Sequence, residues 1–367
     1  MLLPIVLRAG HDYCIISAMP HYRDEATEAE EEEHDEQRGS ALSHRPIDPR
    51  ARRVNIESAV LGVDKNFYVA LPPGYSSAAN SRQRYPTLYL FRGHEREWVH
   101  RQQDHSRHGK TVIDVYRELL EEGQVGPMIL VFPGTSSDSN RVPGLLVNFR
   151  QPALTRREPG IGTGQFEDYF VRELVPYIDT HFRTIPHRRA RAVDGFSLGG
   201  FQSIKIAAQH PELFCSAGSF DGTFLWATNQ GKGVRVRDRV LNNPMFDPAF
   251  GTPRDLEHVA ANSPANLIAI GGRSSLADVQ WLIRSGPEKA EPWQSNYYRA
   301  QHVISLLGAR NIENGVEAVE PEATHNWHWA DRHIATTLPL HWQAMEQAVR
   351  EDFTGVRERS STRLASA

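Results

Sequence analysis

The sequence holds 367 residues, of which 40% are hydrophobic, and its formal net charge at pH 7 is −4. This length suits one large α/β domain with extensions or two small domains, and the hydrophobic share supports a sizeable core. The slightly negative charge excludes a global basic field of the kind that attracts nucleic acid, and no apolar run is long enough to span a membrane.

The N-terminal residues 1–50 predict a disordered acidic extension. Nine acidic side chains fall within residues 24–36, and such a block repels itself and has little apolar surface to bury. The first stretch, MLLPIVLRAG, lacks the basic start and the length of a secretory signal, and the two cysteines suggest no disulfide framework. We therefore expect a cytoplasmic protein with a folded domain at 51–350 and a disordered tail at 351–367.

The folded part begins with a predicted antiparallel hairpin, residues 54–62 and 66–71, joined by a turn at 63–65. Further strands are predicted where short apolar runs recur, at 87–91, 128–132, 189–194, 215–220, 266–271 and 316–320. Helices are predicted where apolar residues follow a 3.6-residue period, at 112–122, 166–181, 198–209, 296–307 and 331–350. This alternation favours an α/β fold with a mostly parallel sheet, helices on both faces and its chemistry at the carboxyl ends of the strands.

A candidate nucleophile lies in the segment GFSLGG, which contains the pattern G-x-S-x-G around Ser197. The segment ARAVD before it reads as a strand and FQSIKIAAQ after it as a helix, which is the context that a nucleophile elbow requires. Small residues at 195 and 199 allow the sharp turn, and the following helix N-terminus favours negative charge developing at the serine. A phosphate-binding turn is disfavoured, because neither G-x-G-x-x-G nor a Walker lysine is present.

A serine hydroxyl needs a general base, which in this fold follows the nucleophile along the chain. His325, in a loop after the last predicted strand, is preferred over His328, His333 and His341. The orienting carboxylate should follow the penultimate strand, predicted at 266–271. The residues leave three candidates open, which are Asp278, Glu288 and Glu291.

The oxyanion hole requires two backbone N–H groups. One is expected from Leu198, directly after the nucleophile, and the other from His94, in the loop that follows residues 87–91.

Aromatic side chains near the site, above all Trp98 and Trp327, are candidates for substrate binding. The histidines at 94, 100, 105 and 108 lack carboxylates at ligand spacing, so no metal is expected.

Five segments together resemble the putative-esterase family of α/β-hydrolases, which includes esterase D type enzymes, enterochelin-type esterases, feruloyl esterases and mycolyltransferases. They are YPTLYLFRG, FEDYFVRELVPYIDTHFRT, AVDGFSLGGFQS, AAQHPELFCSAGSFDG and THNWHW, and the resemblance spans about residues 54–345. It implies an α/β-hydrolase fold with Ser197 as nucleophile, His325 as base, and the amides of Leu198 and His94 as oxyanion donors.

The resemblance also ranks the three candidates for the carboxylate that orients His325. Mycolyltransferase-like members place a glutamate shortly before the next helix, which favours Glu288, then Glu291, whereas an ordinary esterase arrangement favours Asp278. Two residues depart from the family pattern. Arg92 replaces a residue such as His or Asp before Gly93, and Asp194 stands where a small or apolar residue is usual. A buried Asp194 would need hydrogen-bonding partners.

The expected activity is hydrolysis of a small-molecule carboxylic ester through an acyl-enzyme on Ser197, without a cofactor. An acyltransferase would use the same residues, with an alcohol in place of water. A catalytically silent binding protein would require a damaged triad, yet Ser197 and His325 are both present. The sequence does not indicate the oligomeric state or the acyl group.

Overall fold

The computed structural model describes residues 47–155, 157–225, 243–291 and 294–365, so residues 1–46 of the expected extension lie outside the described residues. The described chain starts a few residues before the predicted boundary at 51. Asp48 is fully buried, and its Oδ2 accepts hydrogen bonds from Thr111 Oγ1 at 2.8 Å and from Arg101 at 3.0 Å. These contacts fix the segment before the first strand against the domain.

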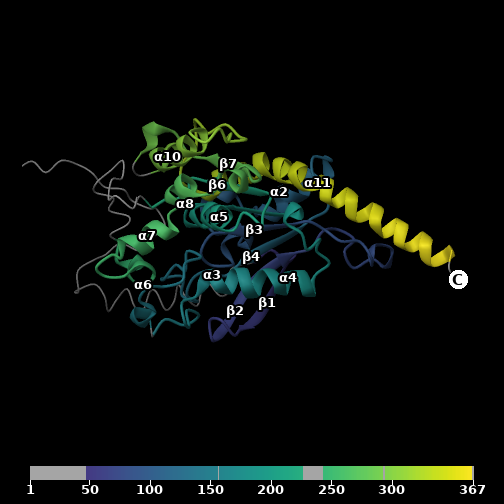
Figure 1. The fold of residues 1–367 in the computed structure, drawn as a ribbon, viewed down its shortest axis with the longest axis horizontal. Coiled ribbons are helices and arrows are strands. Elements are labelled where there is room, and N and C mark those ends of the chain that lie inside the picture. Colours follow the sequence, from purple (N-terminus) through teal and green to yellow (C-terminus); the bar gives the residue numbers. More distant parts are fainter. Residues whose placement is uncertain (1–46, 156, 226–242, 292–293, 366–367) are drawn as a thin grey trace, which may run out of the picture.

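The described residues form a seven-stranded sheet in the order β1-β2-β4-β3-β5-β6-β7 (Figure 1). The first two strands run antiparallel to each other, β2 is antiparallel to β4, and all pairs from β4 to β7 are parallel. The strands are β1 Ala51–Ser58, β2 Val63–Ala70, β3 Thr87–Phe91, β4 Ile129–Pro133, β5 Arg191–Gly195, β6 Ser216–Phe220 and β7 Gln280–Arg284. This is the α/β-hydrolase architecture expected from the sequence, with its N-terminal hairpin and mostly parallel sheet.

Helices cover both faces of the sheet. They are α2 Val112–Glu121, α3 Phe166–Asp168, α4 Val175–His181, α5 Leu198–Gln209, α6 Asp247–Phe250, α7 Leu256–Asn262, α8 Pro264–Ile270, α9 Arg273–Ala277, α10 Tyr297–Gly308 and α11 Trp327–Ala365. A π-helical stretch, Tyr169–Leu174, joins α3 to α4, so the helix predicted at 166–181 is continuous.

Alternate side chains of each central strand enter different cores, as a two-sided sheet requires. In β3, Leu88 and Leu90 belong to the core cluster that holds residues of α2 and α11, whereas Tyr89 and Phe91 belong to the cluster on the other face, which holds residues of α5 and α10. Burial on both faces explains why these strands appear in the sequence as unbroken apolar runs.

The predicted hairpin is confirmed, but its turn is misplaced. The turn occupies residues 59–62, and the segment predicted as turn, 63–65, begins β2. Gly62 has a φ of 68° and donates its N–H to Ser58 O at 2.7 Å, so the chain reverses at the residue best able to adopt this conformation.

Two predicted strands are wrong. Residues 266–271 belong mostly to α8, which starts with Pro264 at its first position, where a fixed φ favours helix. Residues 316–320 form only an isolated bridge, Val319 with Ser285, beside the end of β7. The strand that the sequence did not reveal is β7, whose buried part is only the three residues Trp281, Leu282 and Ile283.

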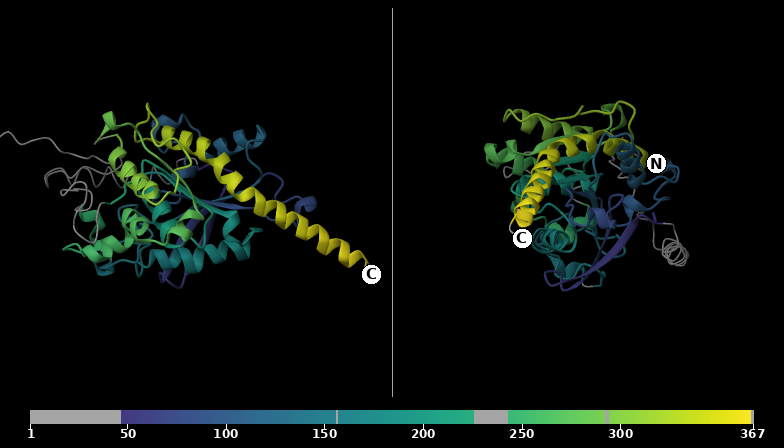
Figure 2. Two further views of the ribbon diagram at one scale, coloured as in Figure 1. Left: turned by 45° about the horizontal axis from the view of Figure 1, so that its top comes forward. Right: turned by 90° about the vertical axis from the view of Figure 1, so that its right-hand side faces the viewer.

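The last helix is longer than predicted and includes residues 351–365, which were expected to be a disordered tail. Figures 1 and 2 show its C-terminal part extending beyond the sheet. An ion pair between Glu351 and Arg189 links the helix to the domain at that point. Within the described residues, no helix combines the length and the apolar character needed to cross a membrane.

A buried charge cluster joins α3 to α5. The Lys205 ammonium is fully buried and donates to Glu167 Oε2 at 2.5 Å and to Leu146 O at 2.6 Å. Glu167 Oε1 also contacts His210 Nε2 at 3.0 Å. Burial alone would raise the pKa of Glu167, but the hydrogen bond with His210 and the charge of Lys205 outweigh it and lower the pKa to about 2.

The pKa of Glu167 predicts a loss of stability in acid. Because the folded pKa lies below the unfolded value of 4.5, the unfolded chain binds more protons as the pH falls, and the stabilisation is lost between about pH 5 and pH 2. We expect Glu167→Gln to lower the free energy of unfolding at pH 7 by roughly 2 kcal/mol, and to approach the wild type only near pH 2. Urea unfolding at several pH values measures this. The exposed neighbour variant Glu212→Gln should keep the wild-type pH profile; a parallel loss there would contradict the assignment to Glu167.

Candidate active site

Ser197 lies at a sharp turn between β5 and α5. It adopts φ 58° and ψ −117°, a conformation that is strained for a residue with a side chain, and its N–H donates to Phe220 O at 3.0 Å. The turn packs tightly against the end of β3, because a Cβ on Gly199 would stand 1.9 Å from Phe91 O. A backbone clash of this kind cannot be relieved by a rotamer change, so position 199 requires glycine. The geometry is that of a nucleophile elbow.

Ser197 contacts a histidine that in turn contacts a carboxylate. His325 Nε2 lies 3.0 Å from Ser197 Oγ, and His325 Nδ1 lies 2.5 Å from Asp221 Oδ2. Ser197 and Asp221 are fully buried, and His325 is 9% exposed. With the proton on Nδ1, the imidazole donates to the carboxylate and its Nε2 is left to accept the serine proton. These three side chains have the relative positions of a serine-hydrolase triad.

Asp221 directly follows β6 and is held by the loop after β7. Its Oδ1 accepts the N–H groups of Asn296 at 2.7 Å and Gly286 at 3.3 Å, while Asn296 Nδ2 donates to its carbonyl at 2.9 Å. These donors fix the carboxylate and leave Oδ2 directed at His325. Asp221 has a φ of 48°, so this loop, like the elbow, has an unusual backbone conformation.

The structure therefore corrects the acid expected from the sequence. Glu288 is exposed, and its carboxylate binds the hydroxyl of Tyr298. Glu291 accepts the N–H of Tyr298 at 3.1 Å, and Asp278 is exposed and 3.8 Å from Arg188. The difference comes from the strand order. The sequence pattern predicts the penultimate strand at 266–271, and every candidate acid after it lies too late in the chain. Among the described strands the penultimate one is β6, and Asp221 is the next residue.

The preferred histidine occupies the expected position, in the loop before α11. The three competing histidines, His328, His333 and His341, do not contact Ser197 in the structure. His328 is exposed and packs edge-on against Trp329, with ring centroids 5.2 Å apart. His333 and His341 are buried beneath the elbow, where the Nε2 atom of each contacts Asp194.

The two backbone amides expected to bind the oxyanion, those of Leu198 and His94, differ in whether another acceptor already occupies them. Leu198 is the first residue of α5, so its N–H stands at the helix N-terminus directly after the nucleophile. The N–H of His94 instead donates to Glu97 Oε2 at 2.8 Å, and the N–H of Gly93 donates to the same oxygen at 3.0 Å. Glu97 reaches back over a single turn, as a capping glutamate does, because its own N–H donates to His94 O. Nothing in the sequence pattern predicts that the carboxylate of Glu97 folds back onto these two amides.

The two tryptophans expected to bind substrate form part of the core behind the elbow. Trp98 is 1% exposed, and its Nε1 donates to Phe91 O at 2.9 Å. Trp327 packs edge-on against Trp98, with centroids 5.0 Å apart, and against Phe196, with centroids 5.3 Å apart. Trp98 therefore has almost no surface left for a substrate. Trp327 instead supports Phe196, whose ring centroid lies 4.7 Å from that of His325, and Trp98 packs behind Trp327.

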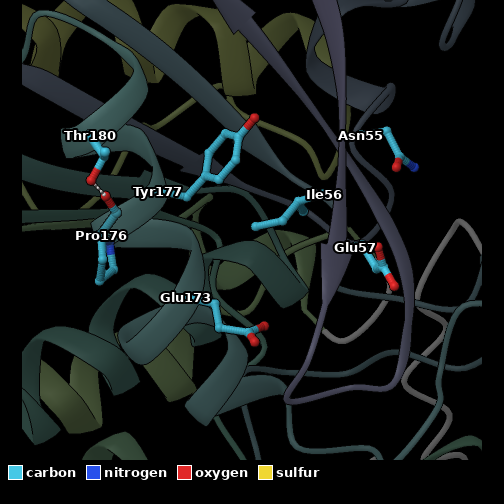
Figure 3. A pocket seen from close by; sticks show the side chains of 7 residues that line it. All are labelled: Asn55, Ile56, Glu57, Glu173, Pro176, Tyr177 and Thr180. Carbon is cyan, nitrogen blue, oxygen red and sulfur yellow. Dashed lines mark hydrogen bonds between the residues drawn. The ribbon is translucent and has the colours of Figure 1, made fainter.

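A shallow, open surface depression lies away from this site. It has a volume of about 410 Å³ and is lined by residues of β1 and of the helical stretch before and within α4 (Figure 3). Its lining includes Glu57, Glu173 and Tyr177, and the hydroxyl of Thr180 donates to Pro176 O within the helix. None of its lining residues belongs to the Ser197 site.

Comparison with curated proteins gives distant relatives. An esterase of Mycobacterium tuberculosis is 26% identical over 226 residues, which are 60% of this chain and 43% of that protein. An endo-1,4-beta-xylanase/feruloyl esterase of Xylanibacter ruminicola is 28% identical over 172 residues, which are 47% of this chain and 21% of that protein. The matched region thus spans less than half the length of each of these relatives.

Comparison with solved structures supports the fold. A ferulic acid esterase superposes with a TM-score of 0.58 at 19% identity, covering 80% of this chain and 98% of that one. An S-formylglutathione hydrolase from Agrobacterium tumefaciens gives a TM-score of 0.56 at 18% identity, covering 82% of this chain and 98% of that one. The family model described as Putative esterase matches residues 58–332, a range that contains Ser197, Asp221 and His325. The chain therefore belongs to the Putative esterase family.

Proposed function

We propose that this protein hydrolyses carboxylic esters through an acyl-enzyme on Ser197, with His325 as general base and Asp221 as its orienting carboxylate. The observation that carries the proposal is the continuous contact from Asp221 through His325 to Ser197 at a strained elbow. Membership of the Putative esterase family supports the same reaction class. Glu288, the acid favoured by sequence, has no part in the proposed mechanism.

The proposed reaction has two steps. His325 Nε2 takes the proton of Ser197 as Oγ attacks the acyl carbonyl, and the protonated imidazole, stabilised by Asp221, then gives that proton to the leaving alcohol. A water molecule activated by His325 next attacks the acyl-serine, releasing the acid and restoring the serine hydroxyl. No cofactor takes part in either step.

The tetrahedral oxyanion needs donors in both steps, and we propose that the amide of Leu198 is the first of them. The amide of His94 is the proposed second donor, but it is bound to Glu97 Oε2. It can serve the oxyanion only by sharing its proton between the two acceptors or after Glu97 has moved. The geometry of the loop at 93–97 should therefore change when a tetrahedral analogue binds.

The test is covalent labelling with a fluorophosphonate probe, which reacts with activated serines. We expect about one label per chain on a peptide containing Ser197, because only a serine that contacts a base is nucleophilic near neutral pH. Mass spectrometry of the digested protein measures the site, and Ser197→Ala should remain unlabelled. The control is Ser203→Ala, on the same helix, whose hydroxyl donates to Gly218 O and which should label normally. Equal labelling of Ser197→Ala and the wild type would exclude Ser197 as the nucleophile.

A further inference from the structure

A buried guanidinium without a hydrogen-bond partner lies beside the candidate nucleophile. Arg92 directly follows β3, its side chain is 7% exposed, and its Nε is sealed from solvent without an acceptor. Within the described part of the chain, none of its guanidinium nitrogens makes a hydrogen bond, in contrast to the buried Arg107, which binds Asp331 and three backbone carbonyls. A buried N–H donor without an acceptor, held near the candidate site, calls for a ligand.

Arg92 lies close to the elbow that carries Ser197. Its neighbour Phe91 pairs with Gly195 across the sheet, so the chain after β3 runs next to the elbow. The guanidinium carbon lies 5.2 Å from the ring centroid of Phe196, the residue before Ser197. The other aromatic neighbours of Phe196 include His325 itself. Arg92 and His325 therefore both lie against the ring of Phe196.

Glu97 is the charged neighbour of Arg92, but it satisfies the guanidinium only weakly. The distance from Arg92 Nε to Glu97 Oε1 is 3.9 Å, which is too long for a hydrogen bond. The other oxygen, Oε2, is taken by the amides of Gly93 and His94. Glu97 thus balances part of the charge of Arg92 and leaves its planar fork of donors unused. That fork matches a carboxylate, which accepts two parallel hydrogen bonds.

We propose that Arg92 binds an anionic group of the substrate, such as a carboxylate, and makes the site selective for negatively charged esters. The proposal rests on the proposed esterase function and adds a substrate class to it. The anion belongs to the acyl part or to the alcohol part of the ester, and both sources offer the same chemistry to Arg92. A purely structural role, as counter-ion of Glu97, would instead affect charged and neutral esters alike.

The experiment compares two matched pairs of esters. For the acyl side, the 4-nitrophenyl half-ester of adipic acid is compared with neutral 4-nitrophenyl hexanoate. For the alcohol side, 4-carboxyphenyl acetate is compared with its methyl ester, 4-(methoxycarbonyl)phenyl acetate. We expect the wild type to prefer the anionic member of at least one pair by about tenfold in kcat/KM, mainly through KM.

The variants assign this preference to Arg92. Arg92→Gln should lose about tenfold in kcat/KM for the anionic ester while changing little for the neutral one. Arg92→Lys should keep part of the preference, because it keeps the charge without the planar fork. Arg96→Gln, in the same loop, is the matched control and should behave as the wild type. Equal losses on both members of a pair would overturn the proposal.

Two further outcomes separate this proposal from the one on which it rests. If none of the four esters is hydrolysed, the proposed esterase function fails as well. If the wild type hydrolyses them without regard to charge, only the role of Arg92 is overturned. Should the Arg92 variants not fold, product inhibition of the wild type decides, with one comparison for each side of the ester. Adipate should compete at least tenfold better than hexanoate if the anion is in the acyl part, and 4-hydroxybenzoate at least tenfold better than neutral 4-hydroxybenzamide if it is in the alcohol part. Equal inhibition within both comparisons would contradict the proposal.

Discussion

Replacing Asp221 with asparagine is expected to lower kcat/KM for a simple ester about 10⁴-fold while leaving the protein folded. Asp221 Oδ2 accepts a hydrogen bond from His325 Nδ1, with the two atoms 2.5 Å apart. An amide at this position does not stabilise the imidazolium that forms when Ser197 attacks, and its NH₂ group can hold the histidine in the wrong tautomer. Steady-state kinetics with 4-nitrophenyl acetate measure the loss, and circular dichroism checks that the fold is kept.

The controls are the three acids that the sequence favoured. Glu288→Gln, Glu291→Gln and Asp278→Asn should each keep kcat/KM within about threefold of the wild type. Glu288 binds Tyr298, and Asp278 lies near Arg188, so their charges act on other partners. A large loss in Glu288→Gln together with an active Asp221→Asn would reverse the assignment and restore the acid expected from the sequence.

The site was predictable where a local pattern carries the chemistry. Ser197 could be placed because the elbow combines a motif with a strand before it and a helix after it, and all three are local in sequence. His325 could be placed because it follows the last strand in the expected chain order. The acid depended on counting strands correctly, and a short apolar run such as 266–271 does not distinguish a strand from a buried helix. The penultimate-strand rule left Asp278, Glu288 and Glu291 open, and the preference for Glu288 came from the family resemblance. Applied to the observed strands, with β7 last and without strands at 266–271 and 316–320, the same rule leads to Asp221.

Other features could not be predicted, because they depend on contacts between distant segments. Glu97 reads as a surface acid in a polar loop, and only the folded turn shows that its carboxylate holds the amides of Gly93 and His94. Trp98 reads as an aromatic residue beside the site, yet the fold places it behind the elbow against Trp327. The need of a buried Asp194 for partners was apparent from its position before the elbow, but its partners were not.

Those partners come from one face of α11. His333, Thr337 and His341 are spaced four residues apart, so their side chains lie along a single stripe of the helix. Asp194 Oδ2 accepts from Thr337 Oγ1 at 2.8 Å and contacts His341 Nε2 at 3.0 Å. Its Oδ1 contacts His333 Nε2 at 3.1 Å and accepts the N–H of Gly195 at 2.6 Å. The carboxylate thus joins the last helix to the strand that carries the nucleophile.

The second large effect is expected when Asp194 is replaced with asparagine, which should lower the free energy of unfolding by about 3–5 kcal/mol at pH 7. Burial alone would raise the pKa of Asp194, but the charge and hydrogen bond of His333 outweigh it and hold the pKa far below its usual value. Because the folded pKa is lowered, this stabilisation is present at neutral pH and is lost only in acid. Urea unfolding at pH 7 measures the change. Glu346→Gln, a half-buried position on the same helix whose ion pair with Arg350 lies at the surface, should shift stability by less than about 0.5 kcal/mol. A similarly small shift in Asp194→Asn would mean that the network beneath Ser197 contributes little to the stability of the fold.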